Sequence, residues 1–321
     1  MNAEIAPLIS VIMGVYNGEK YVSRAVESIL NQTYKNFEFI IINDGSTDNT
    51  KKILESYSDQ RIRLFHQENI GLTKTLNKGL EKARGEFIAR QDADDISHRS
   101  RLERQVRYLE RRPDINLAGT HINFIDKNGK RFSTWRPPET HSDILNALTR
   151  YNCFCHGSVI FRKSCLEKTG PYNEFFLYTQ DYDLWCRIAE CFKVTNIPEV
   201  LYDFRKEAGT ISRKKLSTQL DYHFLTIVLS KERIKKKIGG LTNLPNMSPF
   251  EILKKIYGFS YFEINKFKSQ HYLSYFKEAL KMKDYFYALS LWTKSFFMFP
   301  CKASWKTLIA SVYEIALSGR K

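Results

Sequence analysis

Short apolar runs alternate with amphipathic stretches over the first 95 residues, and this alternation constrains the fold more than any other feature. The strand-like runs are Leu8–Val15, Phe37–Ile42, Ile62–Phe65 and Glu86–Ala89. Helical spacing of apolar residues between them predicts helices over Glu19–Leu30, Asp48–Tyr57 and Leu72–Ala83. Strands that alternate with helices of this length indicate βαβ units and a parallel sheet.

The rest of the chain divides into two parts. Up to residue 212, the pattern predicts helices over Arg101–Arg111 and Tyr182–Cys191, and strands over Ile115–Gly119, Ser158–Arg162 and Val200–Phe204. Beyond residue 213 the strand signals fade, and helices are expected over 214–238, 248–256, 271–282 and 284–297. We therefore expect an α/β domain over residues 1–212, followed by a smaller helical region over 213–321.

Composition sets limits on the class of protein. The 321 residues are 43% hydrophobic and 26% charged, which is typical of a globular chain. We find no run of about 18 apolar residues and no signal peptide in residues 1–8, so we expect a cytoplasmic protein. The six cysteines form no C-x-x-C pair, which argues against a zinc ribbon.

Polar residues follow three of the predicted strands. They are Tyr16-Asn17, Asp44-Gly45-Ser46 and Asp92-Ala93-Asp94-Asp95. Ligands of such sheets bind beyond the carboxyl ends of the strands. Asp92 and Asp94 can converge on one Mg²⁺ or Mn²⁺ ion, although such a triplet also arises in solvated loops. The chain lacks the glycine-rich phosphate loops G-x-x-x-x-G-K-[ST] and G-x-G-x-x-G, so a metal would have to neutralise a bound diphosphate.

Ordered blocks of sequence resemble family 2 glycosyltransferases of the GT-A fold. The blocks begin at Ile9-Ser10-Val11-Ile12-Met13, Ile29-Leu30-Asn31-Gln32-Thr33-Tyr34, Asn43-Asp44-Gly45-Ser46, Asn69-Ile70-Gly71-Leu72, Gly85-Glu86-Phe87-Ile88, His156-Gly157-Ser158-Val159, Gly170-Pro171-Tyr172 and Gln180-Asp181-Tyr182-Asp183. The resemblance covers about residues 7–212 and implies a Rossmann-like nucleotide-binding mixed sheet flanked by helices. Nucleotide-sugar binding is expected over about 7–100, and acceptor binding over about 100–212.

The resemblance also implies roles for single residues on the donor side. Gly14 and Tyr16 match positions that contact the nucleotide base or ribose, and Asp44 matches the aspartate that binds uracil or its ribose. Asp92 matches the aspartate that faces the ribose and the metal, and Asp94 the one that ligates Mn²⁺ or Mg²⁺. The alternative for Asp44 is a turn residue that caps the helix from Asp48.

Asp181 matches the catalytic base of the family. An inverting transfer requires a group that removes the proton of the acceptor hydroxyl, and a carboxylate can do so. The alternative is a helix cap for the predicted Tyr182–Cys191 helix, and both roles are compatible. The family usually has Glu before the base, where this chain has Gln180.

Four further residues are candidates for acceptor or phosphate contacts. His156 matches a position near the acceptor pocket, although a lone histidine is more often structural. Trp135 could stack on a sugar, but we favour packing of its loop onto the core. Glu207 stands near where the family often has a histidine, so Arg205 or Lys206 is the expected phosphate contact. Asp95 is expected to cap the following segment or to join the metal site.

The C-terminal region carries most of the positive charge. Residues 213–321 contain 20 Lys and Arg against 7 Asp and Glu, whereas the whole chain has a net charge of +15. Aromatic residues are interleaved with these lysines. Contact with an anionic membrane is the favoured interpretation, which would place the protein on the inner face of the cytoplasmic membrane. Inward-packed helices with solvated lysines are the alternative, and nucleic-acid binding is the least favoured.

The predicted activity is that of an inverting, metal-dependent glycosyltransferase (a hexosyltransferase, EC 2.4). The resemblance implies transfer from a nucleotide-sugar, with a UDP-sugar favoured, to a hydroxyl of a glycan or lipid-linked glycan in cell-surface polysaccharide or lipopolysaccharide synthesis. The alternatives are transfer to a polyprenyl phosphate, and a non-catalytic module that binds nucleotide-sugar or glycan. The presence of Asp92, Asp94 and Asp181 together argues against the non-catalytic module.

Overall fold

The computed structural model describes residues 6–207, 215–236, 244, 246–281 and 285–298. The chain forms two compact units, one of residues 1–210 and 226–243, the other of residues 211–225 and 244–321. Helix α9 (Leu216–Lys236) therefore contributes residues to both units.

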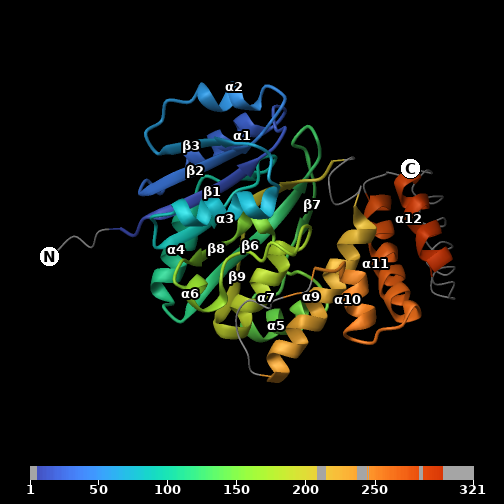
Figure 1. The fold of residues 1–321 in the computed structure, drawn as a ribbon. Coiled ribbons are helices and arrows are strands. Elements are labelled where there is room, and N and C mark those ends of the chain that lie inside the picture. Colours follow the sequence, from blue (N-terminus) through green and yellow to red (C-terminus); the bar gives the residue numbers. More distant parts are fainter. Residues whose placement is uncertain (1–5, 208–214, 237–243, 245, 282–284, 299–321) are drawn as a thin grey trace, which may run out of the picture. The chain divides into compact units, whose positions relative to one another are not determined.

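The first unit is built on one sheet, whose first half is parallel. Its strands are β1 (Ile9–Val15), β2 (Phe37–Asp44), β3 (Ile62–Gln67) and β4 (Phe87–Arg90). They lie in the order β3-β2-β1-β4, and all three pairings are parallel (Figure 1). The four predicted strands and the parallel arrangement are confirmed.

The second half of the sheet is mixed. It contains β5 (Ile96–Ser97), β6 (Ile115–Ile125), β7 (Arg131–Trp135), β8 (Ile160–Arg162) and β9 (Lys193–Arg205). Strand β8 runs antiparallel to β4 and β6, whereas β6 and β9 are parallel. The mixed sheet predicted from the resemblance is confirmed, but β5 and β7 were not predicted.

Strands β6 and β9 extend well beyond the predicted Ile115–Gly119 and Val200–Phe204. Polar residues interrupt their apolar pattern, and these residues find partners only in the folded sheet. Asn123 Nδ2 donates to Asp203 Oδ1 at 2.9 Å, and Asn196 Nδ2 donates to the Pro138 carbonyl at 2.8 Å.

Helices cover both faces of the parallel half of the sheet. They include α1 (Val22–Leu30), α2 (Thr50–Glu55), α3 (Leu72–Lys82) and α4 (Arg101–Arg111). The apolar faces of α1 and α4 share one buried cluster with Ile9, Val11 and Met13 of β1. Helix α3 packs on the opposite face of β1, where a Cβ on Gly79 would collide with Ile12.

Three short helical elements lie between β7 and α7, namely α5 (His141–Leu148), the 3-10 turn His156–Ser158 and α6 (Cys165–Thr169). They were not predicted. Helix α7 (Gln180–Cys191) matches its prediction within two residues.

The described part of the second unit is helical. It contains the start of α9, α10 (Pro249–Lys255), α11 (Tyr261–Lys281) and α12 (Tyr285–Met298). Helices α9, α11 and α12 pack around Leu216, Leu220, Tyr272, Phe276, Ala288 and Leu291. The predicted helix 271–282 begins ten residues too late. Ser260 and Glu263 exchange hydrogen bonds at the start of α11, a capping box that the prediction overlooked. No described helix is both long and apolar enough to cross a membrane.

Candidate active site

The structure brings the predicted donor-side residues to one edge of the sheet. Asp44 ends β2, Tyr16 follows β1 directly, and Asp92 lies two residues beyond β4. Because β2, β1 and β4 are parallel neighbours, their carboxyl ends lie side by side. Tyr16 is 53% exposed there, whereas Asp44 is 3% exposed.

Arg90, the last residue of β4, holds Asp92 in place. The Arg90 side chain is fully buried and donates one hydrogen bond to Asp92 Oδ1 at 2.8 Å. It donates a second to His156 Nε2 at 3.0 Å and a third to the Ile12 carbonyl of β1. The Asp92 carboxylate is therefore oriented by a buried cation that is itself fixed to the sheet.

His156 belongs to this same network. Burial and the nearby Arg90 lower its pKa to about 3, so the ring is neutral at physiological pH. A guanidinium can only donate, so Nε2 must be the accepting nitrogen and Nδ1 must carry the proton. Nδ1 lies 3.8 Å from Asp92 Oδ1, and the Tyr172 hydroxyl lies 3.1 Å from Nε2. The geometry gives His156 a structural link to Asp92.

Asp94 and Asp95 extend the acidic loop after Asp92. Burial, followed by the charge of Asp92, raises the pKa of Asp94 to about 6. Burial, followed by the charges of Asp94 and Asp92, raises the pKa of Asp95 well above its usual value. Asp95 accepts a bond from the backbone N–H of Arg205 at 2.7 Å, and Arg205 Nε donates to the Asp94 carbonyl at 2.7 Å. Asp95 thus connects the acidic loop to the end of β9.

The carboxylates of this loop suit a divalent cation whose remaining coordination positions would be filled by a ligand. Burial and mutual repulsion raise the pKa values of Asp94 and Asp95. A bound cation would relieve this repulsion. No group of three or more His, Cys, Asp or Glu side chains among the described residues could hold a metal alone. Two carboxylates plus water and substrate phosphates are, however, the usual set for Mg²⁺ and Mn²⁺.

Asp44 organises the turn that leads into α3. Its oxygens accept bonds from Gln67 Nε2 at 2.7 Å and from the backbone N–H groups of Ile70 at 2.9 Å and Gly71 at 3.0 Å. Gly71 has φ of 89°, a conformation that favours glycine. The helix-cap alternative for Asp44 is wrong, because Asp48 accepts the bond from Thr50 at the start of α2.

Gly14 lies beneath the first turn of α3. A Cβ at this position would come within 3.1 Å of the Thr75 methyl group and 3.3 Å of Leu72. The glycine therefore lets α3 pack close to the carboxyl end of β1.

Asp181 is the second residue of α7 and is half-buried. Asn152 Nδ2 donates to its Oδ2 at 2.8 Å. Burial raises the Asp181 pKa to about 6, the charge of Asp92 adds to the shift, and hydrogen bonds from Tyr182 N–H and Asn152 oppose it. The Asp92 contribution means that the two carboxylates lie within electrostatic reach of each other. Asp181 also lies in the first turn of its helix, where the helix dipole favours a negative charge.

The remaining candidates are packed into the fold. Trp135, at the end of β7, packs with Phe124 and Phe204 against a cluster that includes Tyr202, as the favoured interpretation expected. Arg205 is 1% exposed and lies 4.2 Å from the Tyr21 ring. Lys206 Nζ lies 4.1 Å from the ring of Phe124.

Sequence reasoning missed three residues that contact the site, namely Arg90, Asn152 and Tyr172. A charged residue at the end of an otherwise apolar strand was an available signal for Arg90, because such residues are seldom fully buried without a partner. Asn152 and Tyr172 had no comparable signal, since they approach Asp181 and His156 only through tertiary folding.

Comparison with known proteins agrees with this geometry. The model of the family "Glycosyl transferase family 2" matches residues 10–170. An uncharacterized glycosyltransferase of Haemophilus influenzae is 31% identical over 303 residues, which cover 88% of this chain and 94% of that protein. The O-antigen biosynthesis glycosyltransferase WbnJ of Escherichia coli is 38% identical over 243 residues, covering 74% and 93%.

Solved structures show the same fold at low identity. Residues 1–349 of TarS from S. aureus, in complex with UDP, superpose with a TM-score of 0.58 at 17% identity, covering 83% of this chain and 80% of that one. A mannosyltransferase from Pyrobaculum calidifontis, in complex with GDP-Man and Mn²⁺, gives 0.56 at 17% identity, covering 98% and 81%. The family match, the two relatives and the acidic strand exits together show that this chain is a member of glycosyltransferase family 2.

Proposed function

We propose that this protein is an inverting, metal-dependent glycosyltransferase that transfers a sugar from a nucleotide-sugar to a hydroxyl of a glycan acceptor. The observation that carries the proposal is the group of partly buried carboxylates beyond the carboxyl ends of β1, β2 and β4. Asp92 lies within electrostatic reach of both Asp94 and Asp181, and burial raises the pKa of Asp94 and of Asp181 to about 6. Such a group suits a cation on one side and a proton acceptor on the other.

The donor would bind at the carboxyl ends of β1, β2 and β4. In the proposal, Gly14, Tyr16 and Asp44 contact the nucleoside, while Asp92 and Asp94 hold Mn²⁺ or Mg²⁺. The metal would stabilise the charge on the departing diphosphate. Complexes of TarS with UDP-GlcNAc and of the P. calidifontis mannosyltransferase with GDP-Man and Mn²⁺ support such a ligand, and a UDP-sugar remains our preference.

Asp181 would act as the catalytic base. The acceptor oxygen forms a bond to the anomeric carbon, the bond from that carbon to the diphosphate breaks, and the hydroxyl proton passes to the Asp181 carboxylate. The hydrogen bond from Asn152 favours the ionised carboxylate, which is the form that can take the proton. One base is sufficient for a single displacement.

The acceptor is proposed to be a glycan or lipid-linked glycan of a cell-surface polysaccharide. Similarity to a protein named for O-antigen biosynthesis supports this class. His156 and Trp135 are the candidate contacts on this side. Arg205 and Lys206 are the candidate phosphate contacts, of which Lys206 is half-buried and Arg205 is 1% exposed.

A thermal-shift panel of nucleoside diphosphates and their sugars, each with and without Mn²⁺, tests the donor proposal. One nucleotide should raise the melting temperature only when metal is present, because binding to the native state stabilises it by mass action. Asp181→Asn should keep this shift and lose turnover. A panel without any shift would favour transfer to a polyprenyl phosphate or a different ligand. Unchanged turnover in Asp181→Asn would refute the base.

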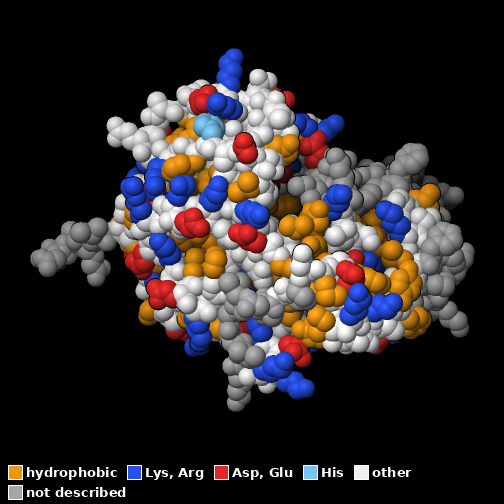
Figure 2. Space-filling model, viewed as in Figure 1, with side chains coloured by type: hydrophobic (Ala, Val, Ile, Leu, Met, Phe, Trp, Pro, Cys, Tyr) orange, Lys and Arg blue, Asp and Glu red, His pale blue; other side chains and the backbone are white. Residues whose placement is uncertain are grey.

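We further propose that the second unit touches anionic membrane at the corner between α10 and α11. Tyr272 and Phe276 of this unit pack inward. At the corner, Ile256, Tyr261 and Phe262 are 53%, 65% and 61% exposed. Figure 2 shows hydrophobic and basic side chains intermixed over this part of the chain. The exposed lysines of α10 and α11 include Lys254, Lys255 and Lys266. Exposed aromatics beside lysines suit a membrane interface.

Sedimentation with phosphatidylglycerol vesicles at low and high salt tests this contact. Tyr261→Ser combined with Phe262→Ser should weaken binding, and each lysine replaced by glutamine should cost about 1 kcal/mol. Leu289→Ser is the matched control, because Leu289 is also 53% exposed but lies on α12. Equal loss in the control, or no binding at low salt, would remove the membrane proposal.

A further inference from the structure

The segment between α6 and α7 leads directly to Asp181 and has no helix or strand of its own. Residues 170–179 carry Tyr172 and connect Thr169, the last residue of α6, to Gln180, the first of α7. Backbone polar groups of a segment without regular structure need partners from elsewhere when they are buried. The identity of those partners determines how firmly the approach to Asp181 is held.

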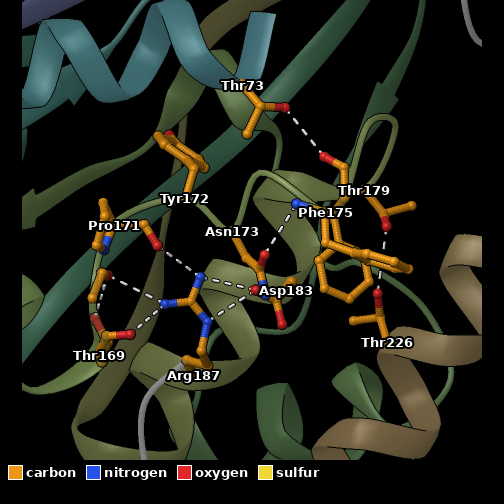
Figure 3. A network of polar contacts seen from close by, with 12 residues as sticks. Thr73, Thr169, Pro171, Tyr172, Asn173, Phe175, Thr179, Asp183, Arg187 and Thr226 are labelled. Atoms are coloured by element: carbon orange, nitrogen blue, oxygen red, sulfur yellow. Dashed lines mark hydrogen bonds and ion pairs between the residues drawn. The ribbon is translucent and has the colours of Figure 1, made fainter. Parts of the chain in front are cut away.

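One buried guanidinium binds three successive carbonyls at the start of this segment. Arg187 of α7 donates to the carbonyls of Thr169 at 2.5 Å, Gly170 at 3.2 Å and Pro171 at 2.9 Å (Figure 3). Its Nε also donates to Asp183 Oδ2 at 2.9 Å, and both side chains are at most 1% exposed. The carbonyls that end α6 are thus satisfied by a cation whose charge Asp183 balances.

Helix α3 holds the same segment from the other side. Asn77 Nδ2 donates to the Tyr172 carbonyl at 2.9 Å, and the Tyr172 N–H donates to Asn77 Oδ1 at 3.0 Å. Thr73 Oγ1 donates to the Phe176 carbonyl at 3.1 Å (Figure 3). The backbone around Tyr172 is therefore bound by side chains of both α7 and α3.

The Tyr172 side chain points back into the candidate active site. It is 1% exposed, and its hydroxyl lies 3.1 Å from His156 Nε2, the atom that also accepts from Arg90. Burial raises the Tyr172 pKa, and the charges of Asp181 and Asp92 add to the shift. The hydroxyl therefore lies within electrostatic reach of both carboxylates.

We propose that Arg187 and Asn77 are positioning residues for the transfer reaction. Together they fix the backbone of Tyr172. Through the contact of its hydroxyl with His156, Tyr172 keeps Asp92 in a fixed position relative to Asp181. This inference rests on the proposed role of Asp181 as the base. Lysine cannot replace Arg187 in this role, because an ammonium lacks the planar fork that reaches three carbonyls and a carboxylate at once.

Hydrogen–deuterium exchange tests the structural half of the proposal without any substrate. In Arg187→Lys, the amides of residues 169–179 should exchange at least about tenfold faster than in the unaltered protein. Arg233→Lys is the matched control, because Arg233 is similarly buried in the same charge network. It pairs with Glu190 at 2.7 Å and lies 3.5 Å from Asp183. Equal exchange in the two variants would overturn the proposal.

Steady-state kinetics test the functional half, with release of UDP from a UDP-sugar as the probe. Arg187→Lys should lower kcat by about 100-fold, which is the order expected for a displacement of about 1 Å. The KM for the UDP-sugar should stay within about threefold, and Arg233→Lys should retain its kcat. Loss of kcat in both variants in proportion to their melting temperatures would reduce Arg187 to a structural role.

Double variants built on Tyr172→Phe test whether Arg187 and Asn77 act through Tyr172 or through the general stability of the fold. In Tyr172→Phe, adding Arg187→Lys or Asn77→Leu should cause little further loss of kcat, because residues that act through one group are not additive. An undiminished effect would contradict the proposed route. If the unaltered protein releases no nucleoside diphosphate from any nucleotide-sugar, the proposed function fails. The hydrogen-exchange data then still test whether Arg187 holds the backbone around Tyr172.

Discussion

Two buried groups of charges in the first unit differ in how they are balanced. The α7–α9 cluster pairs two carboxylates, Asp183 and Glu190, with two arginines, Arg187 and Arg233. The strand-exit cluster sets Asp92, Asp94 and Asp95 against Arg90 and Arg205, with Asp181 also within reach. The first cluster has equal numbers of carboxylates and arginines, whereas the named residues of the second include more carboxylates than arginines.

We infer that the difference separates a structural network from the proposed binding site. Burying a charge without a partner is costly, so a cluster that serves the fold alone is expected to balance itself. Burial raises the pKa of Glu190 as well, but hydrogen bonds from Arg233 are the main opposing effect there. In the strand-exit cluster, neighbouring carboxylates add to the effect of burial on Asp94 and Asp95. A bound cation would stabilise this second arrangement, which fits the proposed metal site.

Removing a carboxylate from the strand-exit cluster should produce the largest effect on activity. Asp94→Asn should lower turnover by about 10³-fold or more, because the metal would lose a ligand where charge develops on the leaving group. The metal-free variant should be as stable as the parent or more so, since a repelling carboxylate is gone. Turnover and thermal melts, each with and without Mn²⁺, measure both. A large loss of stability in metal-free Asp94→Asn would contradict the proposed difference between the strand-exit cluster and the α7–α9 cluster.

The same substitution in the α7–α9 cluster should act on stability. Asp183→Asn should lower the free energy of unfolding by about 3–5 kcal/mol, because Asp183 pairs with both buried arginines, at 2.8 Å from Arg187 and 3.5 Å from Arg233. Urea unfolding measures the change. A loss as small as that of a surface variant such as Glu232→Gln would show that the network is not closed.

The raised pKa of Asp181, which lies within reach of the strand-exit cluster, should also determine the pH dependence of turnover. A base with a pKa of about 6 must be ionised, so kcat/KM should rise about tenfold per pH unit below pH 6 and level off above it. Asn152→Ala should move the midpoint upward, since the hydrogen bond that favours the carboxylate is lost. A pH profile between 5 and 8 for both proteins tests this, and an unmoved midpoint would assign the titration to another group.

The smallest expected effect concerns Glu190. Glu190→Gln removes one charge from the α7–α9 cluster, but the amide oxygen can still accept from Arg233, which keeps Asp183 at 3.5 Å. The loss in free energy of unfolding should be about 1 kcal/mol, with kcat unchanged. A loss equal to that of Asp183→Asn would mean that the two carboxylates are equivalent, and that Asp183 is not the centre of the network.

Local pattern was sufficient to predict the parallel half of the sheet. Each of its strands is a short apolar run that ends in polar residues, and each helix between them shows one apolar face, so both signals lie within a few residues of each other. The start of α11 was missed although its capping box of Ser260 and Glu263 is a local signal. Prediction was weaker for β6 and β9 for a different reason. Their polar residues, such as Asn123 and Asn196, are satisfied by partners far away in sequence.

The sequence by itself determined the class of the protein and the composition of its acidic loop, because Asp92, Asp94 and the strands around them are local features. Tertiary structure alone decided which groups orient these residues. Arg90 meets His156 across 66 residues, and Asn152 meets Asp181 across 29. Asn77 meets Tyr172 across 95. Contacts at such separations depend on how the sheet and its helices pack, and no local pattern of residues encodes them.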